Sequence, residues 1–173
     1  NGCSALTSVT IANGLRNIRD NAFANCSSLT NILLPNSVRN IGHSVFDNCS
    51  SLTQIVIPDS VRNMGESVFR NCSVLESAKL SENITVIPRS TFVNCYSLKS
   101  IAFSSSLTSV DYYAFENCKS LTTITFPKTI RGIYYSNNSP FIGCTNLKTV
   151  NIKGTIPFGL YPIMDYTNAT VYV

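Results

Sequence analysis

The sequence has no tryptophan and a single histidine, and only 13% of its 173 residues are charged. Sites that need several histidines, among them most zinc hydrolase centres, are therefore excluded. No apolar run approaches the ~20 residues of a membrane-spanning helix, so direct membrane insertion is not expected. Hydrophobic residues make up 44%, which excludes a disordered tail. The net charge of +4 is too small to indicate a nucleic-acid partner.

The chain also lacks a starting methionine and a signal-type apolar segment, since it opens with Asn1, Gly2 and Cys3. We therefore expect either that a leader has been removed or that the sequence is a fragment of a longer chain. A missing leader gives no information about location.

What the sequence does contain is a repeat marked by cysteine. Seven cysteines follow one another at intervals of 23 residues, with a last interval of 26. They are Cys3, Cys26, Cys49, Cys72, Cys95, Cys118 and Cys144. A fixed period in the range of roughly 20 to 50 residues indicates a stacked repeat architecture.

Other apolar positions keep the same period. A leucine stands three residues after each cysteine, as at Leu52, and an alternating apolar pair follows, as at Ile55 and Ile57. This alternation of β-branched residues predicts a short strand with one buried face. A second apolar pair, such as Val61 and Met64, predicts a further short extended or turn element. Stacked coils would bury these columns in one continuous core, which no single coil can do.

Each coil ends with a phenylalanine, two residues before an asparagine that precedes the next cysteine. This segment is too short for a regular helix, so a single helical turn or a 3₁₀ turn is expected there. The asparagines are predicted to form a ladder that bonds backbone groups left unpaired by the turn. They are Asn25, Asn48, Asn71, Asn94 and Asn117, and Gly143 takes the place of the next one.

The stretch from Cys49 to Cys72, CSSLTQIVIPDSVRNMGESVFRNC, resembles the repeat of the BspA-like leucine-rich repeat family, also called the treponemal type. The resemblance covers residues 3–156 and departs from the pattern at the insertion around 134–139 and after Ile156. It implies a β-rich, right-handed leucine-rich repeat solenoid with coils of about 23 residues, short parallel strands on one face, and turns or 3₁₀ elements elsewhere.

We expect a single solenoid domain over residues 1–173. Its full repeats span residues 3–25, 26–48, 49–71, 72–94, 95–117 and 118–143, and residues 144–173 form a degenerate C-terminal repeat or cap. The apolar run at 169–173 is predicted to supply the last strand of this cap.

The cysteine column does not indicate disulfides or a metal site. Its count is odd, and side chains in register on neighbouring coils point the same way, so buried free thiols are expected. No Cys-x-x-Cys pair offers metal ligands. The nine acidic residues are scattered, no glycine-rich phosphate loop occurs, and His43 stands alone. The sequence therefore predicts no catalytic residue, no metal, no cofactor and no enzyme activity.

The first of three candidate binding surfaces is the outward face of the predicted strands, which is flat, polar and mostly uncharged. The resemblance implies binding there, because leucine-rich repeat proteins often bind partners on this sheet. The candidate residues are Gln54, Val56, Lys79, Thr123 and Thr125. The alternative is that these side chains only keep the strand surface soluble.

The second candidate surface is a column of arginines, of which Arg39 and Arg62 are the candidate contacts. The column consists of Arg16, Arg39, Arg62 and Arg131. Arginines on coils about 5 Å apart repel one another, and their guanidinium groups suit a sulfated or carboxylated polymer. The alternative is that four nearby carboxylates compensate their charge, those of Asp20, Asp47, Asp59 and Glu66.

The third candidate surface is aromatic and lies beside the insertion that breaks the period. It consists of Tyr112, Tyr113, Tyr134, Tyr135, Asn137 and Asn138. Exposed tyrosines among serine and asparagine resemble an antibody paratope in composition. A loop inserted into a regular scaffold commonly carries function. The alternative is that the tyrosines pack against the insertion as a local core.

The family resemblance implies a non-catalytic protein-binding module of a cell-surface or secreted protein. Members of the family are typically associated with adhesion in bacteria and some protists, so the expected partner is a host matrix or cell-surface protein, or another microbe. A glycan or sulfated polymer is the alternative ligand, and a purely structural spacer is a further alternative. No nucleic-acid partner is expected.

Overall fold

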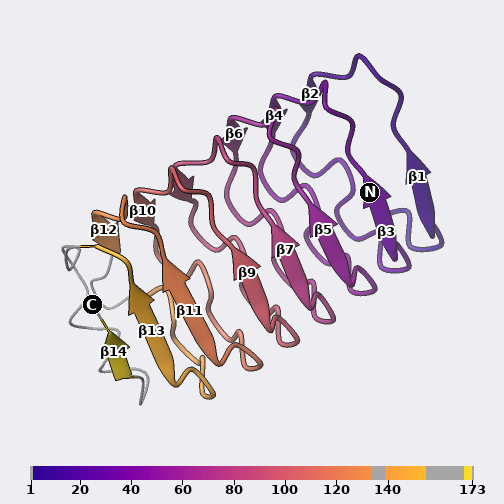
Figure 1. Ribbon diagram of the computed structural model, residues 1–173. Helices are drawn as coiled ribbons and strands as arrows, with labels where there is room; N and C mark the ends of the chain where they lie inside the picture. Colours follow the sequence, from indigo (N-terminus) through magenta and orange to yellow (C-terminus); the bar gives the residue numbers. More distant parts are fainter. Residues whose placement is uncertain (1, 134–138, 155–169, 173) are drawn as a thin grey trace.

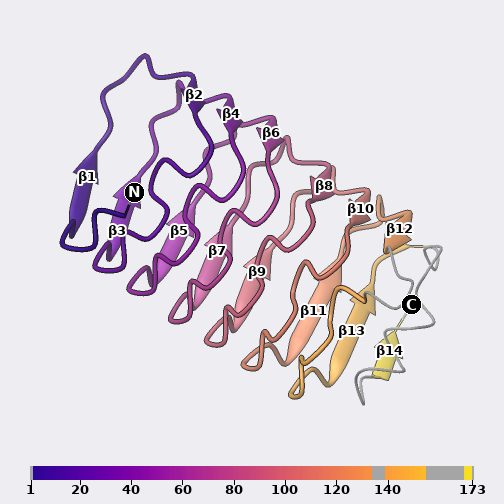
Figure 2. The ribbon, with the colours of Figure 1, turned by 180° about the vertical axis from the view of Figure 1, so that it is seen from behind.

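The structure, a computed structural model, is a solenoid of parallel β-strands and describes residues 2–133, 139–154 and 170–172 (Figure 1). Within these ranges the chain contains no helix. Each of the first six coils places one strand in a long row and a shorter strand in a second row along one edge of the stack (Figures 1 and 2).

The first row holds the longer strands. They are β1 (Ser8–Thr10), β3 (Asn31–Leu33), β5 (Gln54–Val56), β7 (Ser77–Lys79), β9 (Ser100–Ala102), β11 (Thr123–Phe126), β13 (Thr149–Ile152) and β14 (Thr170–Tyr172). The second row holds β2 (Asn17–Ile18), β4 (Asn40–Ile41), β6 (Asn63–Met64), β8 (Val86–Ile87), β10 (Ser109–Val110) and β12 (Gly132–Ile133).

Strands of the first row pair in the register that the 23-residue period predicts. Ile55 lies opposite Ala78, and Ala78 lies opposite Ile101. Contacts between β3 and β5, and between β9 and β11, continue the row where the strand pairing is interrupted. The predicted fold class is therefore confirmed.

Most strands end one residue earlier than the alternating apolar pattern predicts. Only β11 and β13 include the second apolar residue of the pair, Phe126 and Ile152. In the third coil the amide of Ile57 still donates to the carbonyl of Lys79 at 2.8 Å. Pro58 follows at once, and because it has no amide proton the ladder stops there.

The core is made of the apolar columns, and phenylalanine forms the largest of them. Neighbouring rings lie nearly parallel with centroids 5.3–5.6 Å apart. The stack consists of Phe23, Phe46, Phe69, Phe92, Phe115 and Phe141. Leu6, Val9, Ile11 and Phe23 of the first coil are only partly buried and pack against this core.

The asparagine column forms a ladder, as predicted, but most of its bonds join side chains rather than backbone groups. The amide of Asn94 donates to Asn71 Oδ1 at 2.8 Å, and that of Asn117 donates to Asn94 Oδ1 at 2.9 Å. All five asparagines of the column have φ between 59° and 61°, a left-handed conformation that asparagine and glycine tolerate best. Gly143 has φ 73° and meets the same requirement.

The segment before each cysteine is a series of tight turns, not the helical or 3₁₀ turn expected from its length. The amide of Arg70 donates to the carbonyl of Ser67, and that of Cys72 donates to Phe69, each at 3.2 Å. Ser67 has φ 57° and Asn71 has φ 61°. Two left-handed residues so close together prevent a continuous helical run.

Candidate functional site

The outward face of the first strand row presents two columns of side chains, because alternate residues of a strand point away from the core. All five residues predicted there are exposed. They are Gln54 and Val56 on β5, Lys79 on β7, and Thr123 and Thr125 on β11.

Two large aliphatic side chains interrupt the polar character of this face. Leu33 is 79% exposed and Val56 is 56% exposed. They end the neighbouring strands β3 and β5 and occupy the same position in successive coils. Single exposed apolar residues are common on soluble proteins, but two on adjacent strands form a small apolar patch. We call Leu33 and Val56 the apolar pair.

Beside the apolar pair the face is hollowed, where the sequence pattern predicted a flat surface. A depression of about 270 Å³ lies over β5, β7 and β9. Ser77, Ser100 and Ala102 line it and are small, whereas Val56 and Lys79 are longer. The depression therefore follows from differences in side-chain length between three neighbouring strands.

The arginine column is exposed, and none of its four members forms an ion pair with an acid in the described ranges. Arg39 instead donates to the carbonyl of Asn36 at 2.9 Å. Three of the four predicted compensating acids have other partners. Asp47 pairs with Arg70, Asp20 accepts the amide of His43, and Asp59 accepts the amide of Glu82.

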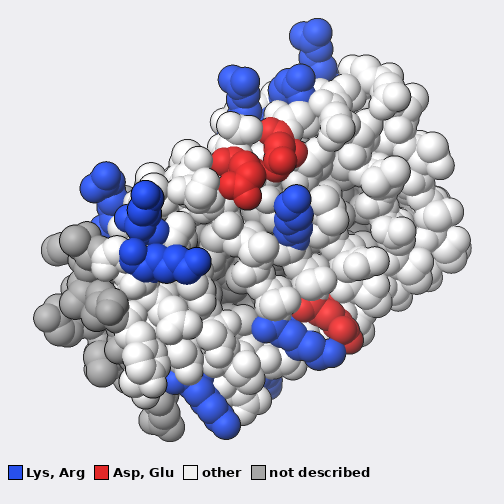
Figure 3. All heavy atoms as spheres, in the orientation of Figure 1, with Lys and Arg blue, Asp and Glu red and all other residues white. Residues whose placement is uncertain are grey.

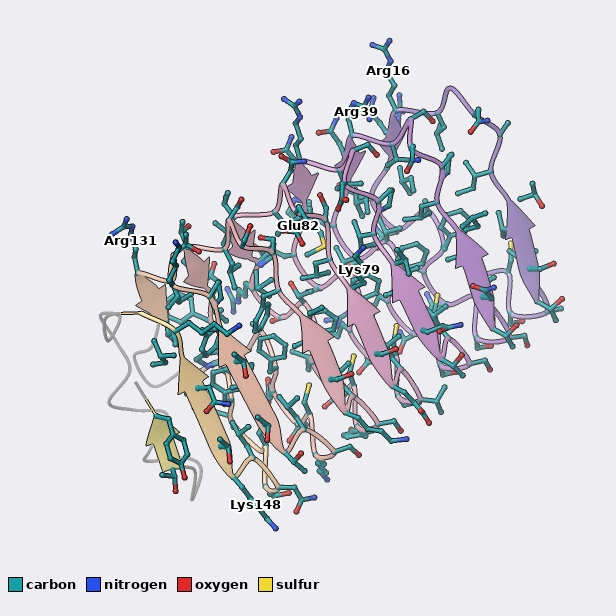
Figure 4. All side chains as sticks on the ribbon, in the orientation of Figure 1. Arg16, Arg39, Lys79, Glu82, Arg131 and Lys148 are labelled. Atoms are coloured by element: carbon teal, nitrogen blue, oxygen red, sulfur yellow. The ribbon has the colours of Figure 1, made fainter. Side chains whose placement is uncertain are left out.

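The arginine column lies along one edge of the stack (Figure 4). Arg16 and Arg39 project from the edge that carries the second strand row, while Glu82 lies on the side of the first row (Figure 4). Positive groups gather along that edge in the space-filling view, with acidic groups below them (Figure 3).

Only part of the predicted aromatic surface falls within the described residues. Tyr112 and Tyr113 are half-buried, and the Arg89 guanidinium lies over the Tyr113 ring, 5.8 Å from its centroid. Tyr113 has φ 56°, the left-handed conformation shared by Ser67 and Ser90 in the same column. The other four predicted residues, Tyr134, Tyr135, Asn137 and Asn138, lie outside the described residues.

The thiols are placed for packing rather than for chemistry. Cys3 is exposed, and the six other cysteines are buried and free. Burial raises the pKa of the Cys49 thiol to about 12, and it also raises the pKa of Cys72 and Cys118. A thiol held in its protonated form is a poor nucleophile and a poor metal ligand. Within the described ranges no group of three or more His, Cys, Asp or Glu residues could hold a metal ion.

Sequence reasoning missed a second depression, which we call the Phe103 hollow. It measures about 500 Å³ and lies beyond the ends of β9 and β11. Phe103, Pro127 and Thr125 line it, together with Lys128 and Lys153. The signal that would have drawn attention to it is Phe103, which stands where most coils have leucine or isoleucine.

The in-register strands, the buried leucine and cysteine columns and the phenylalanine stack together define a leucine-rich repeat solenoid. The sequence profile described as BspA type Leucine rich repeat region, in 6 copies, matches residues 1–122 and 74–158. The chain belongs to this family, which is a non-catalytic repeat fold. No curated protein matches the chain significantly in sequence.

Solved leucine-rich repeat structures share the fold. The T. pallidum protein TpLRR is 29% identical with a TM-score of 0.77, and the match covers 88% of this chain and 71% of TpLRR. A protein from Bacteroides ovatus is 27% identical with a TM-score of 0.64, and 99% of this chain matches 55% of it. A leucine rich cell surface protein from Faecalibacterium prausnitzii has 22% identity, a TM-score of 0.55 and coverages of 97% and 64%, a likeness of fold alone.

These comparisons define the class of the chain as a protein-interaction or structural module. In the part of the chain that the structure describes, no helix is long and apolar enough to cross a membrane.

Proposed function

We propose that the chain is a non-catalytic module that binds a protein ligand on the outward face of its first strand row. The observation that carries this proposal is the apolar pair, Leu33 and Val56, beside the depression over β5, β7 and β9. Apolar surface removed from water contributes about 25 cal/mol per Å² to binding. Gln54 and Lys79 stand next to the pair and supply the polar contacts that orient a partner.

The proposed setting is a cell surface or the secreted state, and the proposed role is adhesion to host matrix or cell proteins or to other microbes. Membership of the BspA-type family supports this setting. A rigid row of strands suits many weak contacts, and presentation in several copies multiplies their strength.

The test is binding of the chain, presented in multiple copies, to a panel of matrix proteins, glycans and sulfated polymers at low and physiological salt. If a protein of the panel binds, Leu33→Ser together with Val56→Ser should lower its affinity about tenfold or more. The reason is that about 1.4 kcal/mol of apolar burial is lost from the binding free energy. The matched control is Leu15→Ser with Val74→Ser, which changes the same residue types at exposures of 42% and 39% outside the strand row.

The proposal fails if the double variant in the strand row binds as tightly as the unchanged chain. It also fails if the control variant loses as much binding, since the loss would then reflect general hydrophobicity or stability. Melting temperatures of both variants are compared with that of the unchanged chain to exclude unfolding.

A second candidate function is binding of a sulfated or carboxylated polymer at the arginine column. Its support is the lack of acidic partners for Arg39 and Arg62 in the described residues. In the same panel, this function predicts a polymer hit that disappears at physiological salt and with Arg39→Ala plus Arg62→Ala. A panel without any hit would favour the structural spacer.

A further inference from the structure

The Phe103 hollow has an apolar wall that is held in a fixed position. Phe103 is half-buried and stacks on Phe126 with centroids 5.3 Å apart, and it meets the ring of Phe115 edge-on at 6.1 Å. Pro127 adds a second apolar surface. Neither side chain has a hydrogen-bonding group, so this wall suits an aromatic or large aliphatic group.

The lining of the hollow carries two lysines and one glutamate, so its net charge is positive. Lys128 and Lys153 are exposed, and neither forms an ion pair in the described part of the chain. Glu82 also lines the hollow, but its Oε2 accepts the amide of Ser105 at 3.0 Å and the hydroxyl of Ser105 at 3.4 Å. Glu82 is held in place by Ser105 but keeps its negative charge, so the described lining has a net charge of +1 that favours a ligand carboxylate at the two lysines.

The hollow adjoins the strand face. Thr125 belongs to β11, where its side chain is exposed, and it also lines the hollow. A ligand that lies along the first strand row therefore has direct access to this depression. The volume of about 500 Å³ falls in the range of roughly 300–1,000 Å³ that is typical of ligand pockets.

We propose that the Phe103 hollow binds an aromatic or large aliphatic side chain of the protein ligand that is flanked by an aspartate or glutamate. The apolar group packs on Phe103 and Pro127, and the carboxylate meets Lys128 and Lys153. This proposal rests on the proposed function, because it specifies what part of a protein ligand the strand face receives.

The charge and the apolar wall together favour an acidic peptide over an acidic sugar. A sugar ring can stack a C–H face on Phe103, but the hydroxyl groups around its edge also require several hydrogen-bonding partners, and Phe103 and Pro127 offer none. A sugar is nevertheless included in the test, and preferential binding of it would overturn the proposal.

The test is a titration of the isotope-labelled full chain, followed by the amide signals of Ser105, Thr125 and Lys128, which line the hollow. The probe is the blocked dipeptide acetyl-Glu-Phe-amide. Acetyl-Gln-Phe-amide removes the charge, acetyl-Glu-Ala-amide removes the ring, and glucuronic acid represents an acidic sugar. We expect the first probe to shift these signals and to bind at least about fivefold more tightly than each of the other three.

Variants of the hollow identify the contacts. Lys128→Gln and Lys153→Gln should each weaken the first probe, and Phe103→Leu should weaken both probes that contain phenylalanine. The matched control is Lys148→Gln, which changes the net charge equally. Lys148 lies far from Glu82, which lines the hollow (Figure 4). Equal binding by all three peptides, shifts confined to another surface, or an equal effect of Lys148→Gln would overturn the proposal.

The two proposals fail in different ways. Suppose that the hollow variants leave dipeptide binding unchanged while Leu33→Ser with Val56→Ser abolishes protein binding. The proposed binding at the strand face is then supported, and the proposed binding in the hollow is wrong. If the dipeptide binds as expected and the apolar pair proves irrelevant, the hollow stands and the proposed contact at Leu33 and Val56 does not.

Discussion

Five of the six buried cysteines, from Cys49 to Cys144, fill space in the stack and also donate a hydrogen bond to a backbone carbonyl. The thiol of Cys72 donates to the carbonyl of Phe46 at 3.1 Å, and that of Cys95 donates to Phe69 at 3.1 Å. An aliphatic side chain at these positions would leave the carbonyl without this donor. Cysteine is thus a small apolar residue that also carries a weak hydrogen bond.

Thiol accessibility gives a prediction at the scale of single residues. With an aromatic disulfide reagent at pH 8, the folded chain should show fast reaction of Cys3 alone, since the other cysteines are buried. Burial also raises the pKa of Cys49, which keeps the thiol protonated, so its labelling should be far slower than that of Cys3.

The measurement is the absorbance of the released thiolate over time, with the chain in denaturant as the control, where all seven thiols should react. Fast reaction of several thiols in the folded chain would contradict the burial of the column. A pH-independent slow phase would instead show that opening of the coil limits labelling.

At the scale of the element, the turn before each cysteine depends on two left-handed residues. Asn71 is one of them, with φ 61°. Its side chain also donates to Asp47 Oδ1 at 3.2 Å and accepts from Asn94 at 2.8 Å. The residue therefore contributes through its conformation and through its side-chain bonds.

A pair of substitutions separates these two contributions. Asn71→Gly removes both side-chain bonds but tolerates the positive φ, whereas Asn71→Ala removes the bonds and strains the backbone. We expect both to lower the free energy of unfolding, and alanine to lower it by about 1 kcal/mol more than glycine. Urea denaturation measures both values. Equal losses for the two variants would show that the left-handed conformation carries little cost here.

The sequence predicted the columns better than it predicted the turns and depressions. Burial of Leu52, Ile55 and Phe69 follows from the period alone, because identical residues must stack in successive coils. Left-handed φ at Ser67 carries no such signal, since serine is common in many turn types. The depressions depend on how side chains of several coils fit together, and no single repeat contains that information.

The same contrast holds for the candidate sites, where positions set by a single strand were predictable and a hollow built from several coils was not. The outward positions of Gln54 and Val56 were predictable from strand alternation, and both are exposed. The Phe103 hollow was missed because its lining extends from Glu82 to Lys153, over four successive coils. The predicted aromatic binding surface stays a prediction, because its residues at 134–138 lie outside the described ones.

At the scale of the whole molecule, each coil contacts only its neighbours, so stability varies along the stack. Leu6, Val9 and Phe23 of the first coil are only partly buried. By contrast, Leu52, Leu75 and other leucines of the central coils are fully buried. The end of this chain that carries β1 is therefore less stable than its middle.

Hydrogen exchange tests this gradient. We expect the amides of β1 and β2 to exchange fastest and those of β5, β7 and β9 to exchange slowest, because opening the first coil breaks one interface and opening a central coil breaks two. Mass spectrometry of peptic fragments measures the rates, with the denatured chain as the reference. Uniform protection along all coils would show that the stack unfolds only as one unit.

The residue-for-residue pairing also limits how such a chain can change in length. Gln54, Ser77 and Ser100 lie opposite one another at steps of 23 residues. Duplication of one whole coil would lengthen the stack by about 4.8 Å and leave every other pairing intact. An insertion of a single residue within a strand would exchange its inward and outward side chains. The length of the stack therefore changes only by whole coils, and the separation between two sites on its surface changes in the same steps.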